Sequence, residues 1–193
     1  MPGMDEVDPR LRLATLNDAD EIDDLMKASI REIFPSFYDA RQTESSIEYI
    51  GCVDRTLIED GTYFVVEAKG EIVACGGWSR RDKVYPGSGA GAEDARLLDP
   101  YTESARIRAM FTRADWTRRG LGRQILEAAE AAAWREGFRS LTLTATLPGK
   151  RLYESYGFVG RRRADFPMPD GTVIECEDMD KPVVAERWAA QSR

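Results

Sequence analysis

Hydrophobic and polar positions follow two different spacings along the first third of the chain, and these predict a strand followed by two helices. Residues 11–16 alternate apolar and polar side chains, which is typical of a half-exposed strand. Asn17 is a suitable N-cap for a helix whose apolar residues recur at helical spacing between Ile22 and Ile33. A second helix is predicted over 45–57, because Ser45-Ser46-Ile47-Glu48 has the form of a capping box.

The middle of the chain predicts a β-hairpin and then a separate strand. Residues 63–68 and 72–78 are rich in β-branched and aromatic side chains, and Lys69-Gly70-Glu71 between them predicts a tight turn. Residues 83–100 are rich in Gly, Ala and Asp without periodicity, which predicts a long loop. The next strand, 104–112, is expected to place alternate side chains on opposite faces. One face would carry Arg106, Arg108, Met110 and Thr112, and the other Ile107, Ala109 and Phe111.

The last third of the chain predicts a long amphipathic helix over 120–136, which Gly137 is suited to end. The pattern then predicts a strand at 141–146, a helix at 150–156, and strands at 158–163 and 172–179. This order of elements predicts a mixed α/β or α+β layered domain. The length suits one domain over 1–193, with residues 1–9 as a flexible tail.

Composition limits the chemistry that such a domain can perform. The chain contains no histidine, which excludes a Ser–His–Asp triad and a His-Glu-x-x-His zinc site. Its 3 cysteines are widely spaced and fit neither a disulfide framework nor a structural zinc site, so no metal is expected. The net charge of −7 disfavours nucleic-acid binding. No apolar run is long enough to span a membrane, and the first residues lack the apolar core of a signal peptide, so we expect no membrane partner and a cytoplasmic location.

Positive charge gathers around one glycine-containing loop within 116–124. The loop lies between a predicted strand and the strongest predicted helix, and it contains Arg118, Arg119, Gly120, Leu121, Gly122 and Arg123. Glycines let the backbone approach a ligand, and a helix N-terminus presents free N–H groups with a partial positive charge. These features predict a phosphate-binding loop. The loop has neither the Walker A pattern nor the third glycine of a dinucleotide fingerprint.

The loop resembles the acyl-CoA signature of the GNAT superfamily of N-acetyltransferases, Arg/Gln-x-x-Gly-x-Gly/Ala. Arg119-Gly120-Leu121-Gly122 matches its last four positions; Thr117 stands first in place of Arg or Gln, and Arg118 is expected to supply the charge. Downstream, 152–158 (Leu-Tyr-Glu-Ser-Tyr-Gly-Phe) is similar to the family's Phe/Leu-Tyr-Glu-x-x-Gly-Phe segment. The resemblance implies a mostly antiparallel central sheet of about seven strands flanked by about four helices.

The resemblance also implies roles for individual residues. Tyr153 matches the family's tyrosine that protonates the departing thiolate of coenzyme A, while Tyr156, three residues along the same helix, is interpreted as packing. The backbone of Met110, Phe111 and Thr112 is implied to contact the cofactor, with an N–H near Met110 or Phe111 stabilising the oxyanion. Pro148 stands where the family often has an asparagine.

The general base and the acceptor are less well defined by the sequence. Without histidine, a carboxylate acting through water is the natural base, with Glu103 the first candidate and Glu67 the second; proton loss directly to solvent stays open. Arg106 and Arg108 either bind a substrate carboxylate or pair with acidic residues. The resemblance implies that the acceptor site is walled by residues 30–42 and 83–100, including Phe34, Phe37 and Tyr38.

Two functions follow from these observations. The favoured one is an N-acetyltransferase that moves an acetyl or acyl group from acetyl-CoA to a primary amine, expected to be that of a small molecule. The other is an acyl-CoA-binding sensor or partner-binding module that has lost the chemistry. The presence of both Tyr153 and the Gly120-Leu121-Gly122 loop favours the enzyme. A homodimer is compatible with apolar surface offered by the late strands and by Trp188.

Overall fold

The computed structural model describes residues 9–83 and 95–189, which form one seven-stranded sheet in the order β1-β2-β3-β4-β5-β7-β6. The strands are β1 (Arg10–Leu13), β2 (Tyr63–Ala68), β3 (Glu71–Ser79), β4 (Ala105–Thr112), β5 (Ser140–Thr146), β6 (Val159–Pro167) and β7 (Val173–Pro182). Neighbouring strands are antiparallel except for β4 and β5, which are parallel. The predicted mixed fold with a mostly antiparallel sheet is therefore confirmed.

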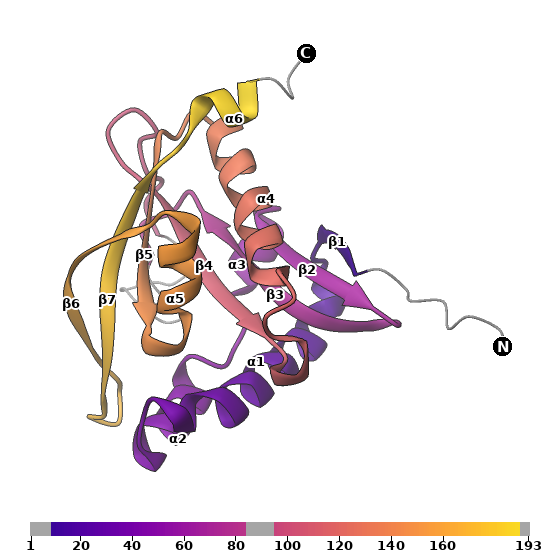
Figure 1. Ribbon diagram of the computed structural model, residues 1–193, viewed down its shortest axis with the longest axis vertical. Helices are drawn as coiled ribbons and strands as arrows, with labels where there is room; N and C mark the ends of the chain where they lie inside the picture. Colours follow the sequence, from indigo (N-terminus) through magenta and orange to yellow (C-terminus); the bar gives the residue numbers. More distant parts are fainter. Residues whose placement is uncertain (1–8, 84–94, 190–193) are drawn as a thin grey trace, which may run out of the picture.

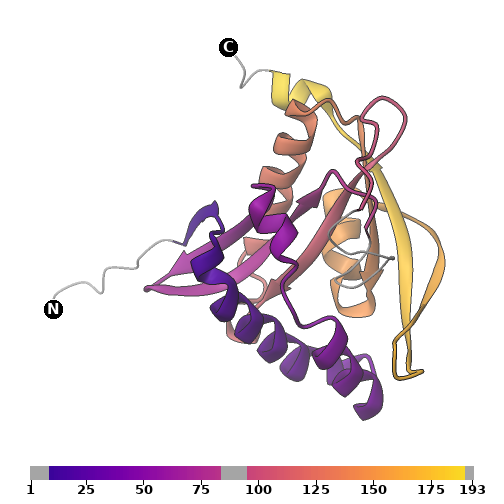
Figure 2. The same cartoon turned by 180° about the vertical axis from the view of Figure 1, so that it is seen from behind.

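Helices cover both faces of this sheet (Figures 1 and 2). One face carries α4 (Leu121–Arg135) and α5 (Lys150–Tyr156), and the other carries α1 (Ala19–Ile33), α2 (Ala40–Tyr49) and α3 (Arg55–Glu59). The short α6 (Ala185–Ala189), which the sequence analysis did not predict, lies at the end of α4. Within the described residues, no helix is both long and apolar enough to cross a lipid bilayer.

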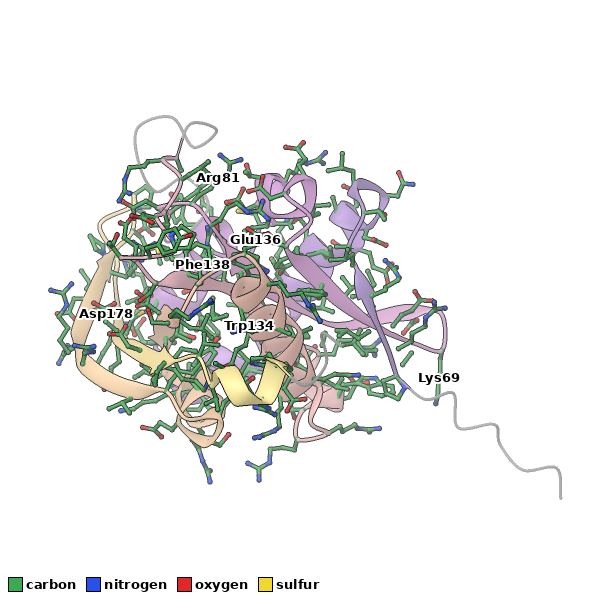
Figure 3. The ribbon with its side chains drawn as sticks, turned by 90° about the horizontal axis from the view of Figure 1, so that it is seen from above. Lys69, Arg81, Trp134, Glu136, Phe138 and Asp178 are labelled. Atoms are coloured by element: carbon green, nitrogen blue, oxygen red, sulfur yellow. The ribbon has the colours of Figure 1, made fainter. Side chains whose placement is uncertain are left out.

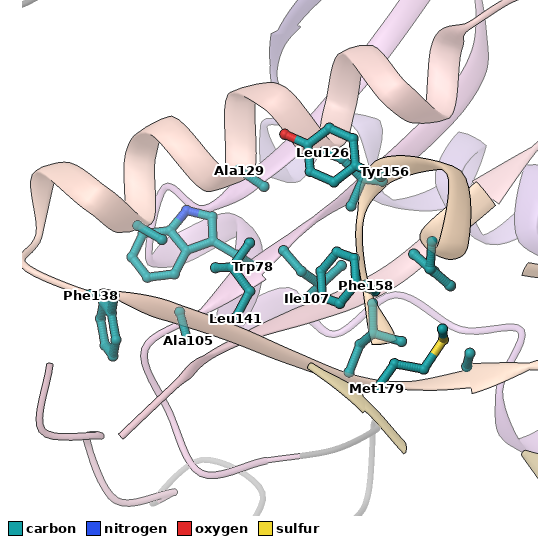
Figure 4. Close-up of a cluster of buried hydrophobic side chains, with 14 of the residues drawn as sticks. Trp78, Ala105, Ile107, Leu126, Ala129, Phe138, Leu141, Tyr156, Phe158 and Met179 are labelled. Atoms are coloured by element: carbon teal, nitrogen blue, oxygen red, sulfur yellow. The ribbon is translucent and has the colours of Figure 1, made fainter. Parts of the chain in front are cut away.

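The largest hydrophobic cluster fills the space between α4, α5 and the sheet (Figure 4). Trp78 and Phe138 are almost fully buried there and meet edge to face, with ring centroids 5.8 Å apart. An aromatic pair of this geometry contributes about 0.5–1.5 kcal/mol beyond the burial of its surface. A second cluster, which includes Ile22 and Met26 of α1, packs against the opposite face. The two clusters fix the sheet between its helical layers.

The prediction of one helix over 45–57 is wrong, because α2 and α3 occupy this region as two shorter helices. The N-cap of α2 is Asp39, whose side chain accepts the N–H of Gln42 at 2.8 Å while the Gln42 side chain accepts the N–H of Asp39 at 3.0 Å. This reciprocal capping box starts the helix earlier than the serines do. Ser46 lies inside α2 and its hydroxyl donates to the carbonyl of Gln42. A new helix, α3, starts after Asp54, whose side chain accepts the N–H of Thr56.

The alternation predicted for the 104–112 strand is broken by a β-bulge. Arg108 is opposite Gly77 and Phe111 is opposite Cys75, so Ala109 and Met110 together oppose Gly76. Ala109 takes the left-handed φ of 51° that this bulge requires. Met110 consequently packs toward α4 while Ala109 and Phe111 pack toward α1, so Arg108 and Met110 do not share a face as predicted.

Beyond the bulge, β4 and β5 separate from each other. Their pairing comprises only Ala105 with Leu141 and Arg106 with Thr142, whereas β5 pairs with β7 along its whole length. A gap therefore opens between the second halves of β4 and β5, flanked by the N-terminus of α4 and by α5 (Figure 1). Residues 1–8 of the predicted tail and 84–94 of the predicted loop lie outside the described part of the chain.

Candidate active site

A cavity of about 710 Å³ occupies the gap between β4 and β5. At one end it is lined by the N-terminus of α4 and by α5, and at the other end by α1 and the turn that follows it. Among its described lining residues there is no aspartate or glutamate, whereas several arginines contribute to it. The cavity therefore favours an anionic ligand at the arginine-rich end.

The N-terminus of α4 presents unpaired backbone donors to this cavity. The first backbone hydrogen bond into the helix runs from Gln124 N–H to Gly120 O at 3.0 Å, so the N–H groups of Leu121, Gly122 and Arg123 have no helical partner. Gly120 takes a φ of 82°, and the space where its Cβ would stand is open. Arg118 also has a positive φ, of 64°, which bends the loop sharply before the helix. This geometry fits a phosphate group.

The two glycines of the loop do different work. Gly120 provides the left-handed backbone at the N-cap, a conformation that costs an L-residue roughly 1–2 kcal/mol. Gly122 instead lets α4 approach α5, because a Cβ there would lie 2.7 Å from Leu152 Cδ2. The Gly-x-Gly spacing thus combines a ligand-facing turn with close packing of the two helices that flank the cavity.

The arginines of the loop face in different directions. Arg118 and Arg123 line the cavity, and so does Arg151 at the start of α5, which the sequence analysis did not select. Arg119 does not line it: its guanidinium lies over the Trp116 ring, 4.5 Å from the centroid, and donates to the carbonyl of Asp115 at 3.2 Å. Arg118, Arg123 and Arg151 thus line this end of the cavity, and Arg123 also pairs with Glu127 at 3.3 Å.

Tyr153 lies in the wall of the cavity, and its hydroxyl has no hydrogen-bond partner among the described residues. Its ring is buried and packs edge to face on Phe158, and the hydroxyl makes no hydrogen bond to any other described residue. Burial raises the pKa of the Tyr153 phenol well above its usual value, so the group is protonated. Gly149 provides room for the ring, since a Cβ there would lie 2.9 Å from Tyr153 Cε2. No other described residue therefore uses the proton of the Tyr153 hydroxyl.

Tyr156, three residues along α5, is held in a buried polar network instead. Its hydroxyl donates to Glu130 Oε2 at 2.5 Å, and Lys181 Nζ donates to Glu130 Oε1 at 2.6 Å. Burial raises the pKa of Tyr156, and the hydrogen bond to Glu130 raises it further. The residue does not line the cavity. The packing role expected for Tyr156 agrees with this placement.

The edge of β4 that faces the gap carries backbone donors without a strand partner. Arg113 donates its N–H to Val73 of β3 at 3.0 Å. Successive N–H groups of a strand point to opposite edges, so those of Met110 and Thr112 are directed toward the gap. Met110, Phe111 and Thr112, for which the resemblance implies contact with the cofactor, all line the cavity.

Neither carboxylate proposed as general base lines this cavity. Glu103 forms a two-pronged ion pair with Arg96, each contact 2.8 Å, and accepts the N–H of Asp99. The ion pair with Arg96, helped by the Asp99 N–H, lowers the pKa of Glu103 to about 2. Glu67 pairs with Arg12 across β1 and β2. Both side chains are thus held by arginines away from the cavity lining.

The far end of the cavity is walled in part as predicted. Phe34 and Phe37 line it, but Tyr38 does not, because its hydroxyl donates to Glu175 O at 2.7 Å and accepts the N–H of Leu147 at 2.9 Å.

Arg106 and Arg108 of β4 pair with acidic residues, which is one of the two roles that the sequence left open for them. Arg106 donates to Asp82 at 2.5 Å, and Arg108 donates to Asp54 at 3.3 Å in a buried site.

Comparison with protein families identifies the class that this fold and cavity define. A family model described as "Acetyltransferase (GNAT) domain" matches residues 59–160 of the 193, so the chain belongs to the GNAT acetyltransferase family. The match includes β2 to α5 and therefore the whole arginine-rich end of the cavity. No curated protein sequence matches the chain.

Solved structures of related folds agree with this assignment. A GCN5-related N-acetyltransferase from Rhodopseudomonas palustris superimposes with a TM-score of 0.70 at 19% identity, covering 93% of this chain and 99% of that one. The N-acetyltransferase PaiA from Thermoplasma acidophilum, solved with coenzyme A, gives 0.61 at 12% identity, covering 91% and 99%. YncA from Salmonella typhimurium, solved with acetyl-CoA, gives 0.59 at 15% identity, covering 91% and 94%. These likenesses show a shared fold.

Proposed function

We propose that this protein transfers an acetyl group from acetyl-CoA to a primary amine, with both substrates bound at once. One observation carries the proposal: the α4 N-terminus and Tyr153 line the same cavity. The N–H groups at the α4 N-terminus have no helical partner, the space next to Gly120 is open, and the Tyr153 hydroxyl has no hydrogen-bond partner among the described residues. Membership of the GNAT family and the coenzyme A ligands of two structural neighbours support acetyl-CoA as the donor.

In this proposal, the pyrophosphate of acetyl-CoA lies at the α4 N-terminus. Backbone N–H groups of Leu121, Gly122 and Arg123 donate to it, and the side chains of Arg118 and Arg123 balance its charge. The pantetheine arm follows the free edge of β4 at Met110, Phe111 and Thr112, where it takes the place of a strand partner. The residues present thus fit the pyrophosphate and the pantetheine arm of the donor.

The acetyl group then lies between β4 and α5. A neutral amine attacks the thioester carbon, and the N–H of Met110 stabilises the oxyanion; such a donor contributes about 3–4 kcal/mol in favourable sites. A C–N bond forms as the C–S bond breaks. The amine nitrogen releases one proton to a base or to solvent, and Tyr153 gives its phenolic proton to the leaving sulfur. Because the pKa of Tyr153 is raised by burial, the phenol stays protonated until the thiolate develops next to it.

The acceptor is proposed to be the primary amine of a small molecule that enters from the α1 side. Phe34 and Phe37 give this end of the cavity a partly apolar wall, which suits a substrate with a hydrocarbon portion next to its amine. An inactive acyl-CoA sensor would have the same α4 loop but would need no proton donor at Tyr153.

Calorimetry with acetyl-CoA, followed by thiol-release assays, tests the proposal. The amine panel should contain alkylamines, diamines, amino acids and peptide N-termini, each at fixed acetyl-CoA concentration. We expect acetyl-CoA to bind and at least one amine to stimulate thiol release, with the acetylated product identified by mass spectrometry. Binding without amine-dependent release would favour the sensor, and absence of binding would refute acetyl-CoA as the ligand.

A further inference from the structure

A second cavity, of about 690 Å³, adjoins the first on the α1 side of the sheet. It lies over β5, β7 and β6, and three residues line both cavities: Arg106, Thr144 and Phe166. Unlike the first cavity, it has carboxylates in its lining, namely Asp165, Asp178 and Asp180. The second cavity therefore offers carboxylates next to residues that also line the first one.

Thr144 connects the two cavities through a directed hydrogen bond. Leu143 and Ala145 are buried in the cluster under α4 and α5, so Thr144 between them faces the opposite side of the sheet. Its register partner on β7 is Asp178, and its hydroxyl donates to Asp178 Oδ1 at 2.7 Å. A threonine hydroxyl has a single proton, and this bond uses it. The oxygen can then only accept a hydrogen bond from a ligand in the cavity.

We propose that Thr144 accepts the N–H of the attacking amine and passes the released proton to Asp178. This inference rests on the proposed function, and it supplies a base, since no carboxylate stands among the described residues that line the first cavity. As the C–N bond forms, the amine proton moves to the Thr144 oxygen and the hydroxyl proton moves to Asp178, which becomes a neutral acid. Tyr153, on the opposite face, protonates the sulfur as the C–S bond breaks.

The surroundings of Asp178 suit this role (Figure 3 labels the residue beside β6 and β7). Its second oxygen, Oδ2, accepts from Arg162 Nε at 2.8 Å, and the Arg162 side chain is 79% exposed. An exposed ion pair of this kind is weak, so Arg162 holds the Asp178 carboxylate only loosely. The other charged or titratable groups that face Asp178 from β4, β6 and β7 are Arg106, Arg161, Asp165, Cys176 and Asp180.

The neighbouring threonine–aspartate pair on β5 and β7, two residues from Thr144 and Asp178, provides a matched control. Thr142 is opposite Asp180 as Thr144 is opposite Asp178, and both threonines point to the same face. However, Thr142 does not line the first cavity, and its hydroxyl lies near Met179 O instead of a carboxylate. Thr142→Val and Asp180→Asn thus make the same substitutions as Thr144→Val and Asp178→Asn, at residues outside the proposed proton route.

The test measures kcat and the KM for acetyl-CoA with the amine of the panel that the wild type acetylates fastest. Thr144→Val and Asp178→Asn are expected to lower kcat about 10²-fold, as loss of a general base does, without changing the KM for acetyl-CoA. Thr144→Ser should restore turnover because it keeps the hydroxyl. Asp178→Ala should regain activity when formate is added as an external base, which a merely structural aspartate would not allow.

The outcomes separate this inference from the proposed function. An active wild type with unchanged kcat in Thr144→Val and Asp178→Asn would overturn the proton route alone. Equal losses in Thr142→Val and Asp180→Asn, with no rescue by formate, would also overturn it by showing a general effect on the sheet. A wild type that turns over none of the amines would refute the proposed function, and the proton route with it.

Discussion

Two tyrosines on one short helix show how the surroundings of a side chain decide its role. Tyr153 and Tyr156 both lie on α5, both are buried, and burial raises the pKa of both phenols. Tyr156 gives its proton to a hydrogen bond with Glu130, whereas the Tyr153 hydroxyl has no partner among the described residues and faces the cavity. Only Tyr153 therefore has a proton available for a substrate.

Tyr153→Phe is expected to lower kcat about 10²-fold while leaving acetyl-CoA affinity unchanged, because only the proton donor is removed. Steady-state thiol release and calorimetry measure the two quantities separately. Tyr156→Phe is the control, since it removes a hydroxyl from the same helix without altering the cavity lining. Similar turnover in wild type and Tyr153→Phe would remove Tyr153 from the mechanism.

The loop arginines differ in a way that binding measurements can detect. Arg118→Ala and Arg123→Ala should each weaken acetyl-CoA binding, by roughly 1.5–3 kcal/mol for a lost hydrogen bond to a charged group. Arg119→Ala should have little effect, because that guanidinium stacks on Trp116 outside the cavity lining. Calorimetry at two salt concentrations distinguishes the variants. A loss for Arg119→Ala as large as for the other two would contradict this assignment.

At the scale of elements, the bulge in β4 depends on a glycine in the neighbouring strand. Met110 occupies the space next to Gly76 where a Cβ would clash with its sulfur, and Ile125 Cγ2 lies 3.2 Å from the same point. Gly76→Ala should therefore destabilise the protein by about 1–3 kcal/mol, as overpacking of a core does. Chemical denaturation measures this loss.

A double-mutant cycle shows whether the clash with Met110 causes that loss. Met110→Ala removes the sulfur, so Gly76→Ala should cost clearly less in the Met110→Ala background than in the wild type. Additive losses would mean that Gly76 acts through its backbone or through Ile125 and not by accommodating Met110 at the bulge.

Elements with a strong local pattern could be predicted from the sequence, and those set by distant contacts could not. The hairpin of β2 and β3 and the apolar stripe of α4 follow from short-range spacing, and both are present. The bulge at Ala109 lies opposite Gly76, whose missing side chain leaves space for Met110 on the neighbouring strand. The spacing of residues within β4 does not reveal this contact. The boundaries of α2 and α3 instead follow from local caps, because Asp39 and Gln42 start α2 and Asp54 starts α3.

The same distinction holds for the candidate site. The α4 loop and Tyr153 lie in contiguous motifs, and the structure brings them into one cavity. Thr144 and Asp178 are 34 residues apart and meet only through the β5–β7 register, so no motif marks them. Arg151 had a local signal, since it precedes Leu152 in the second motif and starts the helix that carries Tyr153.

At the scale of the whole molecule, the sheet consists of two parts that separate around the cavity. Strands β1 to β4 form one part and β5, β7 and β6 the other, with direct pairing between them limited to the start of β4 and β5. Tyr38 crosses to the second part from the segment after α1, where its single hydroxyl bonds both Glu175 of β7 and Leu147 after β5. This residue therefore holds the first helices against the far wall of the gap.

Tyr38→Phe should lower the free energy of unfolding by about 1–3 kcal/mol, because the half-buried N–H of Leu147 loses the hydroxyl that accepts it. Denaturant titration measures the loss, and Tyr101→Phe is the control, since the Tyr101 side chain is exposed. Saturating acetyl-CoA should recover part of this stability, because a ligand that binds only the folded state adds about 2.7 kcal/mol at a hundred times its Kd. If Tyr38→Phe and Tyr101→Phe were equally stable, the Tyr38 hydroxyl would contribute nothing to holding the two parts of the sheet together.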